Sequence, residues 1–303
     1  MPVSHDLDPM AAIEQVPQGT PPSAQADWVS EITPEKPLLH LPLGEIWHYR
    51  DLILLTVWRD FISVHKQTIF GPLWYFAQPL VSTVVYQVVF NGIARLPTNN
   101  IPPFLFYMSG IVIWYYFSAC LSRTSTTFSS NAALFTKVYF PRLAIPIAQC
   151  ISNIWQFLIQ LLIFLGFYFY FLAKGAPIHP SYRIVIIPFL VLQTALLGLG
   201  VGCLVSALST RFRDLQVAVA PAIQLWMYGS CIFYPRSLVP EHLQWVMTLN
   251  PIVPIIEGFR FALMGQGQVE IYQWLASLAV TSILLIIGLV EFGRAEKTFA
   301  DTI

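Results

Sequence analysis

Residues 249–260 read LNPIVPIIEGFR and break an otherwise apolar part of the chain with two prolines and two opposite charges. The segments on either side of Asn250–Pro251 each have the composition of a short helix, and neither reaches the roughly 20 residues that a membrane crossing needs. Glu257 and Arg260 stand three residues apart, so a helix places them on one face, where they can pair.

Irregular backbone persists at membrane depth only where it packs on protein or lines a wet cavity. The stretch therefore predicts a re-entrant helical hairpin that acts as a gate. Its candidate residues are Asn250, Pro251, Pro254, Glu257 and Arg260. The alternative is a hairpin in the membrane interface whose charged side chains extend to water.

The composition around this stretch is that of a membrane protein. The chain is 56% hydrophobic and only 11% charged, whereas soluble domains are about a quarter charged. A formal net charge of zero provides no basic field for nucleic acid. The four cysteines lie in apolar runs without a CxxC motif, which favours small buried core residues over a metal or redox site.

Six apolar runs are long enough to be membrane-spanning helices, at roughly 71–93, 104–122, 144–172, 184–208, 215–234 and 272–292. Of the 16 Lys and Arg residues, 11 lie on the side of the two termini and five on the other. The positive-inside rule then places both termini in the cytoplasm and the hairpin, between spans 5 and 6, outside.

Residues 43–66 are amphipathic, with Ile46, Leu54, Val57, Phe61 and Val64 on one apolar side. This pattern predicts a helix in the membrane interface, although the first turns of a packed core helix would have a similar composition. The candidate interface residues are Trp47, Arg50, Trp58, Arg59, Asp60 and Lys66. Residues 1–42 are rich in Pro, Ala, Gln and acids, have no signal-peptide pattern, and are expected to be a flexible cytoplasmic tail.

Together these features predict an all-α integral membrane protein. It has six transmembrane helices, an N-terminal amphipathic interface helix and a re-entrant outer hairpin.

Catalytic and energy-coupling motifs are missing from the sequence. It contains no GxxxxGK[ST], HExxH or GxSxG motif, and no Asp or Glu from Phe61 to Arg213. Proton-driven carriers commonly use intramembrane acids, and a membrane glycosyltransferase needs a catalytic acid or a metal site. Both classes are disfavoured, and the energy source is expected to be another subunit.

Two cytoplasmic connections are candidates for receiving that energy, although positive charge is expected in such loops in any case. The first, residues 129–143, and the second, residues 209–216, contribute the coupling candidates Asn131, Lys137, Phe140, Pro141, Arg142, Arg211, Phe212, Arg213 and Asp214. Asp214 also favours the start of the following helix through the helix dipole.

Spans 2 and 3 are rich in aromatic residues. Most aromatics of this kind form interfacial belts or pack between helices. The sharper alternative is a conduit, because sugar rings stack on aromatic faces, and Tyr and Trp side chains form hydrogen bonds with sugar hydroxyls. The candidates for a glycan path are Tyr107, Trp114, Tyr115, Tyr116 and Tyr168.

Four stretches together carry a resemblance to a known family: residues 54–80, 129–148, 209–219 and 249–260. In this order, on six spans of this orientation, the sequence resembles the permease subunit of ABC-2-type exporters of surface polysaccharides, which include O-antigen, capsule and teichoic acid transporters. Residues 43–303 would be the ABC-2-type transmembrane domain.

The resemblance implies a homodimer of the permease with two copies of a separate P-loop ATPase subunit, in the inner membrane. ATP and Mg would be bound by that subunit, and no cofactor by this chain. Residues 131–142 and 211–214 would be coupling helices, and the hairpin would be the outer gate. The substrate would be a lipid-linked polysaccharide such as the O-antigen of lipopolysaccharide. An ABC-2 exporter of drugs or lipids is the main alternative, and a membrane glycosyltransferase or polymerase a weaker one.

Overall fold

The computed structural model describes residues 43–66, 73–131, 135, 140–178, 182–265 and 270–301. Within these ranges every regular element is a helix and no strand occurs, so the predicted all-α class is confirmed. The tail predicted at residues 1–42 and the coupling candidate Lys137 lie outside the described residues.

Five helices are long and apolar enough to cross a membrane: α3 with the π-helix η1 (Leu73–Ile93), α4 (Pro103–Ser125), α7 (Ala144–Ala173), η2 with α8 (Arg183–Ser209) and α12 (Ile271–Asp301). They correspond to the predicted spans 1, 2, 3, 4 and 6. The chain is therefore a multi-pass membrane protein.

The predicted span 215–234 differs from the other five. Its helix, α9 (Asp214–Tyr228), has 15 residues, which at 1.5 Å per residue gives about 22 Å, shorter than the roughly 30 Å of a hydrocarbon core. From Gly229 onward the backbone leaves the helix, and Cys231 adopts a left-handed φ of 53°. In this segment the backbone carbonyls of Cys231 and Ile232 accept hydrogen bonds from the side chain of Arg260.

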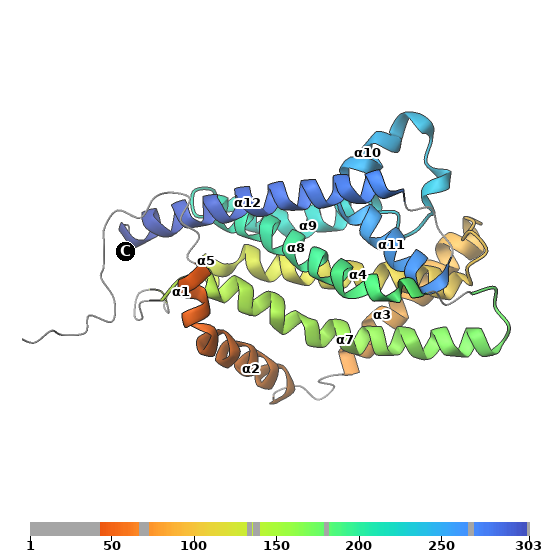
Figure 1. Ribbon diagram of the computed structural model, residues 1–303, viewed down its shortest axis with the longest axis horizontal. Coiled ribbons are helices and arrows are strands. Elements are labelled where there is room, and N and C mark those ends of the chain that lie inside the picture. The colour runs from red at the N-terminus through yellow and green to blue at the C-terminus, as the bar shows by residue number, and fades with distance from the viewer. Residues whose placement is uncertain are drawn as a thin grey trace, which may run out of the picture. The chain divides into compact units, whose positions relative to one another are not determined.

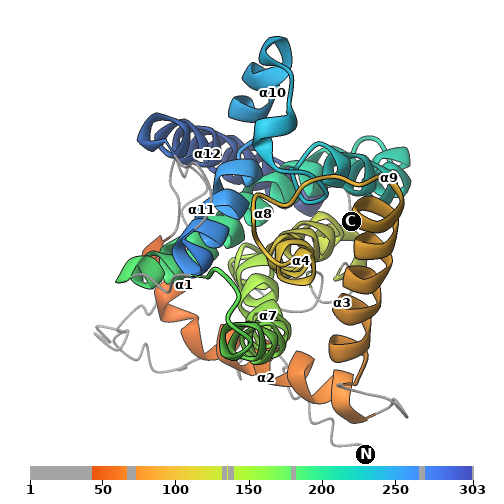
Figure 2. The same cartoon turned by 90° about the vertical axis from the view of Figure 1, so that its right-hand side faces the viewer.

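The long helices α4, α7, α8 and α12 run in roughly the same direction, with α4 at the centre of the bundle and α3 inclined against it (Figures 1 and 2). Helix α4 contacts α3, α7, α8, α9 and α11, and α8 lies between α4 and α12. Accordingly, 78% of the apolar stretch of α4 is buried within the chain, against 11% for α3 with η1. Helix α3 therefore presents most of its side chains to whatever surrounds the chain.

Glycines allow α8 to approach its neighbours closely. A Cβ added at Gly200 would lie 2.6 Å from Leu285 Cα on α12, and one added at Gly198 would lie 2.7 Å from Cys120 Cβ on α4. Small residues at such positions let helix backbones come together in membranes, where packing replaces the hydrophobic effect as the driving force.

The predicted amphipathic segment forms two helices, α1 (Leu43–His48) and α2 (Arg50–Lys66). One face of α2 packs on α7, with the rings of Phe61 and Trp155 5.3 Å apart. The other face is also apolar and carries Leu54, which is 61% exposed instead of lying on the packed side, together with Trp58. This second face fits a helix in contact with lipid, and its interface role remains a prediction.

We expect Gly200→Ala to reduce the thermal stability of the purified protein, because a methyl group at this position meets the backbone of α12. Overpacking of this kind costs about 1–3 kcal/mol. Gly166→Ala on α7 is the matched control, since nothing lies within 4 Å of its added Cβ. Melting followed by size-exclusion chromatography in detergent should separate the two variants, and equal melting temperatures would show that the close α8–α12 approach is wrong.

Candidate functional site

The predicted outer hairpin forms two short helices, α10 (Gln244–Leu249) and α11 (Ile252–Met264), which meet at 92° around Asn250–Pro251. The 3-10 turns η3 (Arg236–Leu238) and η4 (Glu241–Leu243) precede them. Helix α11 is almost wholly buried, whereas the side chains of α10 are largely exposed. Figure 1 shows α10 standing off the bundle and α11 lying against one end of it.

Arg260 is the most completely bonded side chain of this site. A guanidinium has five N–H donors, and each of them has an acceptor here. The acceptors are Ser109 Oγ (3.2 Å from Nε), Cys231 O (2.8 Å) and Glu257 Oε1 (2.9 Å) on one terminal nitrogen, and Phe106 O (3.2 Å) and Ile232 O (3.2 Å) on the other. The guanidinium also lies 3.8 Å from the centroid of the Phe106 ring.

The expected pairing of Glu257 with Arg260 is therefore present, and it lies inside the protein. The two side chains are 7% and 1% exposed, so neither charge extends to water. Gly110 makes room for the pair, because a Cβ there would lie 3.0 Å from the guanidinium. The carbonyls of Cys231 and Ile232 turn toward Arg260, which explains why α9 ends short of its predicted length.

Asn250 connects the break in the hairpin to the end of α9. Its side-chain carbonyl accepts the indole N–H of Trp226 at 3.0 Å, and its amide nitrogen donates to Gly229 O at 2.8 Å. The same side-chain oxygen accepts the backbone N–H of Ile252 at 3.3 Å, at the start of α11.

Pro251 connects the same break to α12. The hydroxyl of Ser277 on α12 donates to Pro251 O at 2.6 Å and accepts the side-chain amide of Gln193 on α8 at 2.8 Å. Next to this contact, Arg236 donates to the side chain of Gln273 on α12. Pro254, in the first turn of α11, is buried and is tolerated there because that turn has no intrahelical partner for its missing N–H.

At the opposite end of the bundle, the first predicted connection is bound to α12 (Figure 1). The guanidinium of Arg142 donates to Glu296 O at 2.8 Å and lies 5.4 Å from the Phe135 ring centroid. Phe128, in α5 (Thr127–Ser130), stacks on Phe292 of α12 at 4.5 Å. Of the other candidates, Phe140 and Pro141 are buried, and Asn131 donates to Thr127 O at 3.0 Å.

The second predicted connection is exposed. Arg211, Phe212, Arg213 and Asp214 all project into the surroundings of the chain, and the Phe212 side chain is 63% exposed. An exposed aromatic residue between two arginines has the composition of a protein contact surface. Asp214 begins α9.

Most of the predicted glycan-path aromatics lie inside the bundle. Tyr107, Trp114, Tyr116 and Tyr168 are at most 3% exposed, because α4 is the central helix and α7 packs on it. Tyr168 donates to Leu263 O of α11 at 2.9 Å. Tyr115 is partly exposed and shares a 2.7 Å hydrogen bond with Ser82 of α3. In one copy of the chain, only Tyr115 of this set is partly open to a partner or substrate.

The interface candidates lie along α1 and α2. Trp47 and Trp58 are exposed, Arg50 pairs with Asp51, and Arg59 pairs with Asp60 at 3.1 Å. Asp60 also lies 4.0 Å from Arg123 on α4. The side chain of Lys66 lies outside the described residues.

Several partners in this site were not singled out in the sequence: Ser109, Gly110, Gln193, Ser277 and Glu296. The adjacent small residues at 109–110 carry a weak signal, because a buried arginine needs space and acceptors. The others lie in helices distant in sequence from the residues they bind.

Comparisons with known proteins give one consistent result. The model of the ABC-2 type transporter family matches residues 51–264. The chain is 28% identical over 253 residues to the O-antigen export system permease protein RfbA of Klebsiella pneumoniae, covering 83% of this chain and 94% of that protein. It is 27% identical to RfbA of Myxococcus xanthus, covering 86% and 98% of the two chains. It is 25% identical to the polysialic acid transport protein KpsM of Escherichia coli, covering 75% and 86%.

We expect Arg260→Gln to destabilise the protein strongly, because the change leaves Glu257 buried without its counter-ion and several acceptors without a donor. Breaking a buried ion pair from one side costs about 3–5 kcal/mol. Arg50→Gln removes an exposed pair from α2 and should change stability by at most about 1 kcal/mol. Denaturation of the two purified variants in detergent tests the contrast, and a wild-type midpoint for Arg260→Gln would contradict the five-acceptor arrangement.

Proposed function

The chain belongs to the ABC-2 type transporter family, and we propose that it is the transmembrane subunit of an ATP-driven exporter of a lipid-linked surface polysaccharide. Relatives named for O-antigen export and polysialic acid transport match it over three quarters or more of its length, and these matches carry the proposal. The polymer is of the O-antigen type and moves from the cytoplasmic side of the inner membrane to the outer side.

In the proposed complex, two copies of this chain associate with two copies of a P-loop ATPase, which binds ATP and Mg. The connections 129–143 and 211–214 face this ATPase in the cytoplasm, together with both termini. The exposed Phe212 and its flanking arginines support a docking role. This chain itself binds no nucleotide and performs no catalysis.

The second copy is proposed to face α3 and α9. Both helices expose large apolar side chains, including Val81, Val84, Val217 and Leu225. Because packed side chains fill the space around α4, the polymer would pass between the two copies and not through one bundle. Tyr115, at the contact of α4 with α3, is the conduit candidate nearest to such a path.

The hairpin would close the outer end of this path. Nucleotide-driven displacement of the first connection reaches α12 through Arg142 and Glu296, and α12 bonds to Pro251 through Ser277. Displacement of the second connection acts directly on α9, which bonds to Asn250 through Trp226. Both connections thus have a bonded route to the break between α10 and α11.

Deletion of the gene tests this function. We expect the loss of one surface polysaccharide, with its lipid-linked form building up in the cytoplasmic membrane. Glycan analysis of the cell surface and of the membrane fraction measures both. Normal surface glycans would instead favour an exporter of drugs or lipids, and loss without internal build-up would favour a role in synthesis.

Arg213→Glu should lower the ATPase activity of the assembled complex by about tenfold or more, because a reversed charge at a docking surface costs at least about 1.4 kcal/mol. The side chain is exposed, so insertion and folding should be unchanged. Lys174→Glu, just after α7, is the control, since it reverses an exposed charge at the opposite end of the bundle from both connections. Full activity and export in the Arg213 variant would refute the docking assignment.

A further inference from the structure

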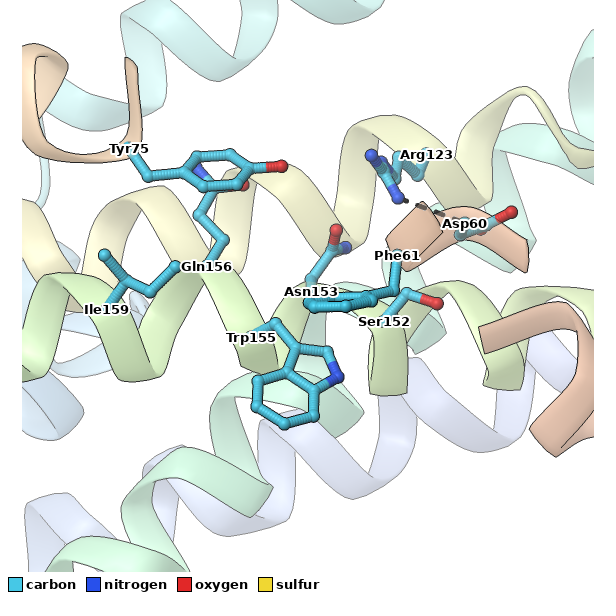
Figure 3. Close-up of a pocket in the computed structure, with 9 residues that line it drawn as sticks. All are labelled: Asp60, Phe61, Tyr75, Arg123, Ser152, Asn153, Trp155, Gln156 and Ile159. Atoms are coloured by element: carbon cyan, nitrogen blue, oxygen red, sulfur yellow. Dashed lines mark ion pairs between the residues drawn. The ribbon is translucent and has the colours of Figure 1, made fainter. Parts of the chain in front are cut away.

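A small hollow of about 30 Å³ lies where α2, α3, α4 and α7 meet (Figure 3). Its walls are mixed in chemistry: a charged pair, three aromatic rings and several polar groups. The lining residues are Asp60, Phe61, Tyr75, Arg123, Ser152, Asn153, Trp155, Gln156 and Ile159. The proposed gate and docking surfaces use none of them.

The hollow contains both signs of charge. Asp60 accepts from Arg59 at 3.1 Å, and its other carboxylate oxygen forms an ion pair with Arg123 at 4.0 Å. Asp60 is also the last carboxylate in the sequence before Asp214. Asp60 and Arg123 line the hollow and Arg59 pairs with Asp60 beside it, so the site can hold a cation and an anion side by side.

The remaining walls suit a small ammonium group. Phe61 and Trp155, whose ring centroids are 5.3 Å apart, both line the hollow; Figure 3 shows the two side chains near each other. Aromatic faces attract cations. Among the described residues, the buried hydroxyl of Ser152 has no hydrogen-bond partner, and a buried polar atom of this kind calls for one.

We propose that this hollow binds the headgroup of a phosphatidylethanolamine from the inner leaflet. The ammonium enters the hollow and donates to Asp60 and Ser152, while the phosphate meets Arg123 and Arg59. A trimethylammonium group has no N–H to donate to Asp60 and Ser152, so the site selects ethanolamine over choline headgroups.

The surroundings of the hollow fit a lipid. Trp58 and Leu54 on α2 and Leu158 on α7 are exposed apolar side chains near the lining residues. They provide surface for acyl chains on either side of a headgroup. The assignment to the inner leaflet rests on the orientation given under the proposed function. The chemistry of the site does not depend on that orientation.

The test uses the permease–ATPase complex in nanodiscs of defined lipid. We expect melting several degrees higher in phosphatidylethanolamine than in phosphatidylcholine, because a ligand that binds only the folded state stabilises it. N-methylated ethanolamine lipids should lose the effect as methyl groups are added. Equal melting in ethanolamine and choline lipids, or equal melting in phosphatidylglycerol, would overturn the proposal.

A matched pair of variants locates the effect. Asp60→Asn should lower retention of phosphatidylethanolamine, measured by native mass spectrometry, by about tenfold, the loss expected for one charge-assisted hydrogen bond. Asp51→Asn removes an exposed carboxylate from the same helix and should retain the lipid. Unchanged retention in Asp60→Asn would refute the site. If the wild-type complex shows no lipid selectivity but the polymer is still exported, only this proposal is overturned. If the complex binds phosphatidylethanolamine selectively but the deletion strain has normal surface glycans, only the export function is overturned.

Discussion

A buried guanidinium requires an acceptor for every donor, and this requirement at Arg260 organises one end of the molecule. An ionised group left unpaired in a low-dielectric interior would cost several kcal/mol. Backbone carbonyls therefore have to accept the hydrogen bonds for which no side-chain acceptor is present. Three of the five acceptors are backbone carbonyls, at Phe106, Cys231 and Ile232. Helix α4 provides one of them, and the other two become available only because α9 ends early. The short α9, the left-handed backbone at Cys231 and the buried α11 thus all relate to the need of Arg260 for hydrogen-bond acceptors.

Both predicted connections are linked to the hairpin break, the first to Pro251 and the second to the adjacent residue Asn250. Helix α12 is bonded near one end to Arg142 and near the other to Pro251, with Glu296 and Ser277 19 residues and about 28 Å apart along the helix. Helix α9 begins at the exposed second connection and ends against Asn250. Because packed helices move as rigid bodies, a relative shift of α9 and α12 acts on the bond between Asn250 and Pro251.

Periodicity and charge predict the membrane helices well, because the cost of unsatisfied backbone in lipid leaves few alternatives. Five spans, the break at Asn250–Pro251 and the Glu257–Arg260 pair were all predictable from local sequence. The early end of α9 was not, since its cause is a guanidinium 28 residues away. Of the aromatic path candidates on α4, Tyr107, Trp114 and Tyr116 lie in the core of one copy, and their burial was not predictable because a sequence does not reveal which helix becomes central. For the same reason the partners Ser277 and Glu296 could not be identified beforehand.

The two halves of the hairpin differ in how firmly they are held, and this difference determines which half can move. Helix α11 is fixed to α4 by Arg260 and to α7 by the hydroxyl of Tyr168. Helix α10 is mostly exposed, and Arg236, in the turn η3 that precedes α10, donates to Gln273 of α12 and to Thr248 of α10. A force delivered at Asn250–Pro251 therefore meets high resistance on the α11 side and low resistance on the α10 side. Under the proposed gating function, the outer end would open by rotation of α10 about the break, with α11 remaining part of the bundle.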